Sequence, residues 1–153
     1  MKERFSLFLL TAAILLPSIA QAEFYLRPRV GATFAIDGGD TAYSVGAAAG
    51  FWWNKYLATE ISYSRLIGSG SAPDGDLIRG EGIVSYPLPV ATPFVSGGFG
   101  ASHVGGWDPM ILAGGGVSLN ALAPFFIEGG FSYAAVFGRP DFIEPYAAVG
   151  IGF

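Results

Sequence analysis

The stretch FYLRPRVGATF, residues 24–34, alternates between two kinds of side chain with a period of two. Its even positions are apolar, whereas its odd positions are polar or small and include Arg27 and Arg29. Successive side chains of a β-strand point to opposite faces. The stretch therefore predicts a strand with one apolar face and one polar face.

The same alternation recurs along the chain and reaches its last residue. In the closing stretch 143–153, Ile143 and Val149 share a face with Phe153, opposite Glu144 and Tyr146. Alternating segments between these two stretches bring the expected number of strands to eight. The expected strands are 23–35, 41–53, 56–67, 77–87, 92–104, 109–120, 124–137 and 142–153.

Two long segments without charge, 82–107 and 109–127, also fit the hydropathy of membrane-spanning helices. Their local chemistry favours strands instead. Glycine runs at 97–100 and 114–116 would cost a helix about 1 kcal/mol per residue relative to alanine. The surrounding valine, isoleucine, phenylalanine and tyrosine favour strands.

The composition excludes several classes of function. The chain has 153 residues, of which 13% are charged and 52% hydrophobic, with 23 glycines, no cysteine and a net charge of −4. The length indicates one domain. The negative charge argues against a nucleic-acid partner. The absence of cysteine excludes disulfides, zinc–thiolate sites and thiol nucleophiles.

The N-terminus has the features of a secretory signal peptide. Basic residues in MKER precede an apolar segment, and Ala20-Gln21-Ala22 fits the small-residue cleavage rule. We interpret residues 1–22 as the signal peptide and 23–153 as the mature domain.

The connections between the expected strands alternate in length and polarity. Those near 54, 88 and 122 are short and lack acids, whereas all six aspartates lie in or beside the other connections. Short periplasmic turns opposite longer polar loops are typical of outer-membrane barrels. We predict an all-β, eight-stranded antiparallel up-and-down transmembrane β-barrel with both termini periplasmic.

These features together resemble the small outer-membrane β-barrel family of Gram-negative bacteria, which includes opacity-protein-like and OmpA-type transmembrane domains. The opening strand, the hairpin GFWWNKYLATEISYS (50–64) and the closing AVGIGF (148–153) carry the resemblance. It implies an outer-membrane location among lipids that include lipopolysaccharide. It also implies biogenesis through periplasmic chaperones and the barrel-assembly machinery, and a monomer as the final state.

The resemblance further implies a C-terminal assembly signal. Its residues would be Tyr146, Val149, Ile151 and Phe153. A second interpretation makes Phe153 simply the last lipid-facing residue of an aromatic belt. The two interpretations are compatible.

The polar faces of the expected strands carry seven charges into the barrel interior. They are Arg27, Arg29, Glu60, Arg79, Glu81, Glu128 and Glu144. Buried charges persist only when paired, so we predict a luminal ion-pair network with arginine as the bidentate partner. Such a network either forms the polar core of the barrel or gates a narrow channel. The first interpretation is favoured because eight strands enclose little free space.

Aromatic residues are expected to form two belts at the membrane interfaces. One would lie near the turns and the other near the loops. The residues are Phe51, Trp53, Tyr56, Tyr86 and Phe125 for the first belt, and Tyr43, Tyr63, Trp107, Phe137 and Phe142 for the second.

Pro28 and Pro145 fall in the two strands that must pair to close the barrel. Proline cannot donate a ladder hydrogen bond. We therefore expect a bulge or an outward-tilted rim near Pro145, or else a weakened seam.

Catalysis finds little support in the sequence. The single histidine, His103, lies near the loop rim and invites comparison with lipid A deacylases. It lacks their spaced serine and asparagine and has no obvious acid beside it, so no triad can be assembled. No metal-ligand spacing is present, although Asp74 and Asp76 could bind Ca²⁺ weakly, and no cofactor is expected.

The preferred hypothesis is a non-enzymatic integral outer-membrane barrel with a structural or surface-interaction role. Two alternatives stay open: a narrow channel for small solutes, and a lipid A-modifying enzyme.

Overall fold

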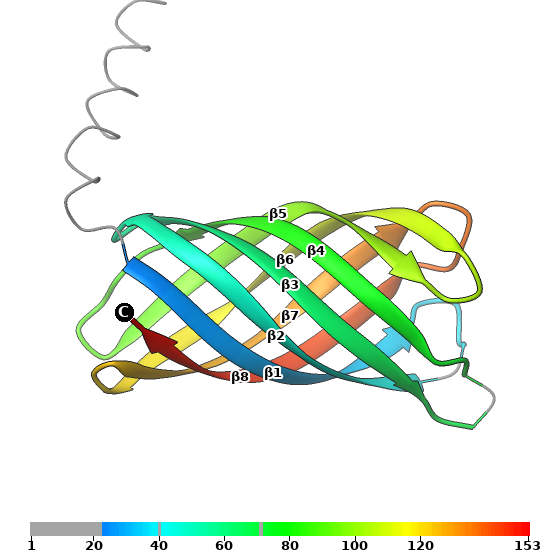
Figure 1. Ribbon diagram of the computed structural model, residues 1–153, viewed down its shortest axis with the longest axis horizontal. Helices are drawn as coiled ribbons and strands as arrows, with labels where there is room; N and C mark the ends of the chain where they lie inside the picture. Colours follow the sequence, from blue (N-terminus) through cyan, green and yellow to red (C-terminus); the bar gives the residue numbers. More distant parts are fainter. Residues whose placement is uncertain (1–22, 40, 71) are drawn as a thin grey trace, which may run out of the picture.

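The computed structural model describes residues 23–39, 41–70 and 72–153; the expected signal peptide, 1–22, lies outside these ranges. The described residues form a closed antiparallel barrel in which each strand pairs with the next and β8 pairs with β1 (Figure 1). The strands are β1 (Glu23–Ala35), β2 (Thr41–Asn54), β3 (Leu57–Gly68), β4 (Gly75–Ser85), β5 (Ala91–His103), β6 (Trp107–Leu122), β7 (Phe125–Val136) and β8 (Phe142–Gly152).

This architecture confirms the expected eight-stranded up-and-down barrel. Every strand end lies within about two residues of its expected position, which is the usual uncertainty of strand limits. Within the described part of the chain, no helix has the length and apolar character needed to cross a membrane.

The two ends of the barrel differ in their connections (Figure 1). At one end, here called the turn end, lie the connections after β2, β4 and β6 together with both Glu23 and Phe153. The opposite, loop end carries the connections after β1, β3, β5 and β7. Each loop-end connection contains one glycine with positive φ, a conformation that side chains disfavour. These glycines are Gly38, Gly70, Gly105 and Gly138.

The seam between β1 and β8 keeps one register along its whole length. Paired residues run from Tyr25 with Gly152 to Ala35 with Phe142 without a shift. The expected bulge near Pro145 is therefore absent. Pro28 pairs with Ala47 of β2, and Pro145 pairs with Phe131 of β7. Neither proline has a partner across the seam, so the pairing is interrupted at these positions without a change of register.

Candidate functional site

Along each strand, odd and even sequence positions (their parity) place side chains alternately on the outer face and in the interior of the barrel. Along β1, Phe24 and Leu26 are 64% and 50% exposed on the outer face, whereas Tyr25 and Arg27 are each 3% exposed. The other strands repeat this pattern, most regularly in β3 and β4. The outer face is therefore almost wholly apolar, and the polar and charged side chains of the strands gather in the interior.

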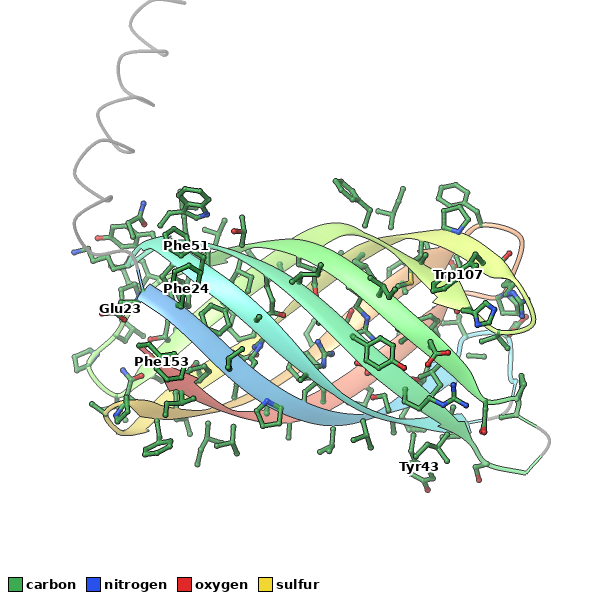
Figure 2. The ribbon with its side chains drawn as sticks, viewed as in Figure 1. Glu23, Phe24, Tyr43, Phe51, Trp107 and Phe153 are labelled. Carbon is green, nitrogen blue, oxygen red and sulfur yellow. The ribbon has the colours of Figure 1, made fainter. Side chains whose placement is uncertain are left out.

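Aromatic residues of the outer face lie at both ends of the barrel. Figure 2 shows Phe24, Phe51 and Phe153 at the turn end, and Tyr43 and Trp107 at the loop end. Phe51 packs edge-on against both Phe24 and Trp53, with ring centroids 4.9 Å apart in each pair. Phe142 was wrongly assigned to the loop-end belt. It lies on the inward face of β8 and is buried, because it shares the parity of Glu144.

Three of the seven predicted interior charges meet in one group, the Arg27 cluster, consisting of Tyr25, Arg27, Glu60, Glu128 and Tyr146. Arg27 contacts Glu60 twice, from Nη2 to Oε1 and from Nε to Oε2, each at 2.7 Å. Its Nη1 contacts Oε1 of Glu128. The Tyr25 hydroxyl donates to Glu60 at 2.9 Å, and the Tyr146 hydroxyl donates to Glu128 Oε1 at 3.0 Å. One guanidinium thus serves two carboxylates.

A second group, the Glu144 cluster, reverses this ratio. Glu144 Oε2 lies 3.1 Å from Arg29 Nη2 and 2.6 Å from Arg79 Nη2. Its Oε1 accepts a 2.5 Å hydrogen bond from the Ser44 hydroxyl, and the carboxylate is completely buried. The Arg29 guanidinium also stacks on the Tyr146 ring at 4.1 Å, which is close enough for a cation–π contact. Two guanidinium groups here share one carboxylate.

Glu81, the seventh predicted interior charge, makes its polar contact with a serine and not with an arginine. Its Oε1 accepts a 3.0 Å hydrogen bond from the Ser96 hydroxyl of β5. The other six interior charges are divided into two clusters of opposite net charge. Excess negative charge lies with the Arg27 cluster and excess positive charge with the Glu144 cluster.

An apolar cluster closes the interior on the loop side of the Glu144 cluster. This loop-end seal consists of Ala42, Leu66, Leu77, Met110, Leu112, Ala134, Val136 and Phe142, with Val104 packed against it. Leu77 and Ala134 are wholly inaccessible to solvent. Sequence reasoning missed the seal, although Leu77 shares the parity of Arg79 and was therefore identifiable as inward.

The turn end of the interior is open. A cavity of about 910 Å³, here called the turn-end cavity, is lined by the inward aromatic residues Tyr25, Trp52, Phe94 and Phe126. Glu128 of the Arg27 cluster also lines it. The interior is thus packed with apolar side chains at the loop end and contains a cavity at the turn end.

The four residues of the expected assembly signal, three in β8 and Phe153 directly after it, do not share one side of the barrel wall. Val149, Ile151 and Phe153 share the outward parity, whereas Tyr146 points inward and bonds Glu128. The backbone N–H of Phe153 donates to the carbonyl of Phe24 at 2.8 Å, which ties the C-terminus to β1.

An acid does lie beside His103, contrary to the sequence-based expectation. Register pairs Asp76 of β4 with His103 of β5, and Asp76 Oδ2 is 3.7 Å from His103 Nδ1. The same carboxylate accepts bonds from Tyr63 at 2.6 Å and from Arg65 at 3.1 Å. No group of three or more potential metal ligands gathers among the described residues.

No protein-family model and no curated protein sequence matches the chain. Solved structures do match its fold. The N-terminal β-barrel domain of Pseudomonas aeruginosa OprF superposes with a TM-score of 0.69 at 15% identity, covering 86% of this chain and 97% of that one. Neisserial surface protein A (NspA) gives 0.67 at 16% identity, covering 86% and 97%.

The attachment invasion locus protein Ail of Yersinia pestis gives a TM-score of 0.53 at 11% identity, covering 86% of this chain and 98% of that one. The chain thus has the fold of the small eight-stranded outer-membrane β-barrels.

Proposed function

We propose that the mature chain is a non-enzymatic, integral outer-membrane β-barrel of a Gram-negative bacterium, with a structural or surface-interaction role in the envelope. The apolar outer face carries this proposal. Large side chains such as Val30, Ile61 and Phe99 are 55%, 63% and 76% exposed around a wall that has no free edge. An exposed apolar surface of this extent fits hydrocarbon, and a closed sheet satisfies its backbone there.

The difference between the two ends of the barrel supports one orientation in the membrane. Short turns of outer-membrane barrels are periplasmic and longer loops extracellular. The turn end, with Glu23 and Phe153, would then face the periplasm. Residues 1–22 would direct secretion as a signal peptide. Tyr146, Val149, Ile151 and Phe153 would present the assembly signal to the barrel-assembly machinery after periplasmic chaperones deliver the chain.

A structural or surface role is better supported than conduction. The loop-end seal consists of buried side chains, among them leucine and methionine, that pack inside the loop half of the barrel. NspA is named as a surface protein and Ail for attachment and invasion, which concerns those proteins but suits the same fold. The loops of this chain would then make the surface contacts, next to lipopolysaccharide in the outer leaflet.

A role without catalysis is supported by the surroundings of His103. The two oxygens of Asp76 are already engaged by Tyr63 and Arg65, so this acid is poorly placed to orient the imidazole. Lipid A incubated with the barrel should stay acylated. Deacylation that disappears in His103→Ala would contradict the non-enzymatic assignment.

Fractionation and gel mobility test the membrane proposal. The expressed protein should stay in the outer-membrane fraction after an alkaline wash. Detergent-extracted protein should migrate differently before and after boiling, because a folded barrel resists the detergent. Release by the alkaline wash would contradict an integral location. Planar bilayers containing the folded barrel should show no steady conductance, and defined unitary currents would favour the channel alternative.

A further inference from the structure

The turn-end cavity combines features that the structural role leaves unused. Its volume of about 910 Å³ lies within the range of small-molecule sites, about 300–1,000 Å³. Four of its lining residues, Tyr25, Trp52, Phe94 and Phe126, belong to one packed inward group. Tyr25 holds this group together, with ring centroids 5.9 Å from Trp52 and 6.1 Å from Phe126. The aromatic wall is therefore preformed.

The deep side of the cavity carries negative charge. Glu128 is 7% exposed and lines the cavity. Both of its polar contacts within the described chain, from Arg27 and Tyr146, are made to Oε1. Its Oε2 is therefore left for a ligand donor. Glu60 competes for the same guanidinium, so Arg27 does not fully neutralise Glu128.

The charged residues at the mouth of the cavity do not cancel the negative charge of its deep side. Glu23 adds a second carboxylate to the lining. Lys55 is the cationic lining residue, and its ammonium lies over the exposed ring of Tyr56 at 4.9 Å. Aromatic faces attract cations through their quadrupoles, and a buried carboxylate strengthens that preference.

We propose that the turn-end cavity is a binding site for a small organic cation, an amine with an apolar or aromatic body. The ammonium group would donate to Glu128 Oε2, and the apolar body would pack against Trp52, Phe94 and Phe126. This inference depends only on residues inside the barrel. It goes beyond the structural role proposed for the molecule.

Fluorescence of Trp52 offers a direct test, because Trp52 lines the cavity. The folded, full-length mature barrel is placed in phosphatidylcholine nanodiscs, with Trp53 and Trp107 both changed to phenylalanine so that Trp52 is the single reporter. Three probes of matched shape are titrated: benzylamine, benzyl alcohol and benzoate. We expect benzylamine to bind about tenfold or more tightly than either of the others, as one charge-assisted hydrogen bond suggests.

Variants then locate the site. Glu128→Gln should weaken benzylamine by about tenfold and leave benzyl alcohol unchanged. Glu23→Gln, a control with the same chemical change at the mouth, should alter benzylamine binding by less than about threefold because an exposed charge is screened. Ser118→Phe, which fills the cavity from a lining position on β6 and adds no second tryptophan, should abolish binding of every probe and keeps the test valid if Glu128→Gln fails to fold.

Three results would overturn the inference. The first is equal binding of the amine, alcohol and acid. The second is benzylamine affinity unchanged in Glu128→Gln or in Ser118→Phe. The third is no binding of benzylamine to a barrel that keeps its heat-modifiable migration, an outcome that leaves the membrane proposal standing while refuting the cavity site.

Discussion

Leu77 and Ile78 are neighbours in β4, yet they lie on opposite sides of the barrel wall. Leu77 is completely buried in the loop-end seal, and Ile78 is 41% exposed on the outer face. The outer face accepts apolar side chains with no protein partner, whereas an inward side chain must fit or be paired. Adjacent residues of one strand thus meet different physical requirements, which alternate along the strand.

The contribution of an ion pair to the free energy of unfolding should differ more between the two faces than any other contribution. Glu144→Ala leaves two buried guanidinium groups without their carboxylate and should cost about 3–5 kcal/mol of unfolding free energy. Asp76→Ala, which removes the outer-rim partner of Arg65, should cost much less because solvent screens an ion pair at the surface. Equilibrium urea unfolding in lipid vesicles measures both. A similar loss of unfolding free energy in both variants would contradict the difference between the interior and the outer face.

A charge placed on the outer face should be costly in proportion to its depth. Ile61→Arg, near the middle of β3, should destabilise the barrel in vesicles by about 2–4 kcal/mol. Phe137→Arg, in the connection after β7, should cost about 0–1 kcal/mol because it lies at the rim. The same unfolding assay applies. A negligible effect at Ile61 would place that face in water instead of hydrocarbon.

Two adjacent glycines of β5 allow the steric requirements of the two faces to be compared. A Cβ at Gly98, on the inward face, would lie 2.0 Å from the backbone oxygen of Gly80, whereas one at Gly97 would lie 3.6 Å from its nearest neighbour. Gly98→Ala should therefore cost about 1–3 kcal/mol, as overpacking does. Gly97→Ala should change stability by less than about 0.5 kcal/mol. Thermal midpoints from heat-modifiability gels distinguish them, and a reversed order would contradict the inward assignment of Gly98.

Parity along each strand was enough to predict the fold and the side of most residues. The alternation in 24–34 placed Arg27 inward and Val30 outward, where the structure has them. Parity also identifies Phe142 as inward, whereas its position near the loops wrongly suggests the aromatic belt. A local pattern therefore predicts sidedness better than position along the strand does.

Contacts across the barrel could not be read in the same way. Arg79 lies on β4 and Glu144 on β8, so their contact depends on how strand tilt and register stagger the whole sheet. The proximity of Asp76 to His103 likewise depends on the register between β4 and β5. The turn-end cavity reflects the summed volumes of side chains from many strands, which no single segment encodes.

Trp52 and Trp53 give the most direct test of the central claim, that adjacent side chains alternate between the interior and hydrocarbon. Trp53 is exposed on the outer face beside Phe51, and Trp52 packs inward against Tyr25. Single-tryptophan barrels are folded into vesicles of phosphatidylcholine brominated near the carbonyl end of its acyl chains. The account predicts strong quenching of Trp53 fluorescence and weak quenching of Trp52. Equal quenching, or stronger quenching of Trp52, would contradict it.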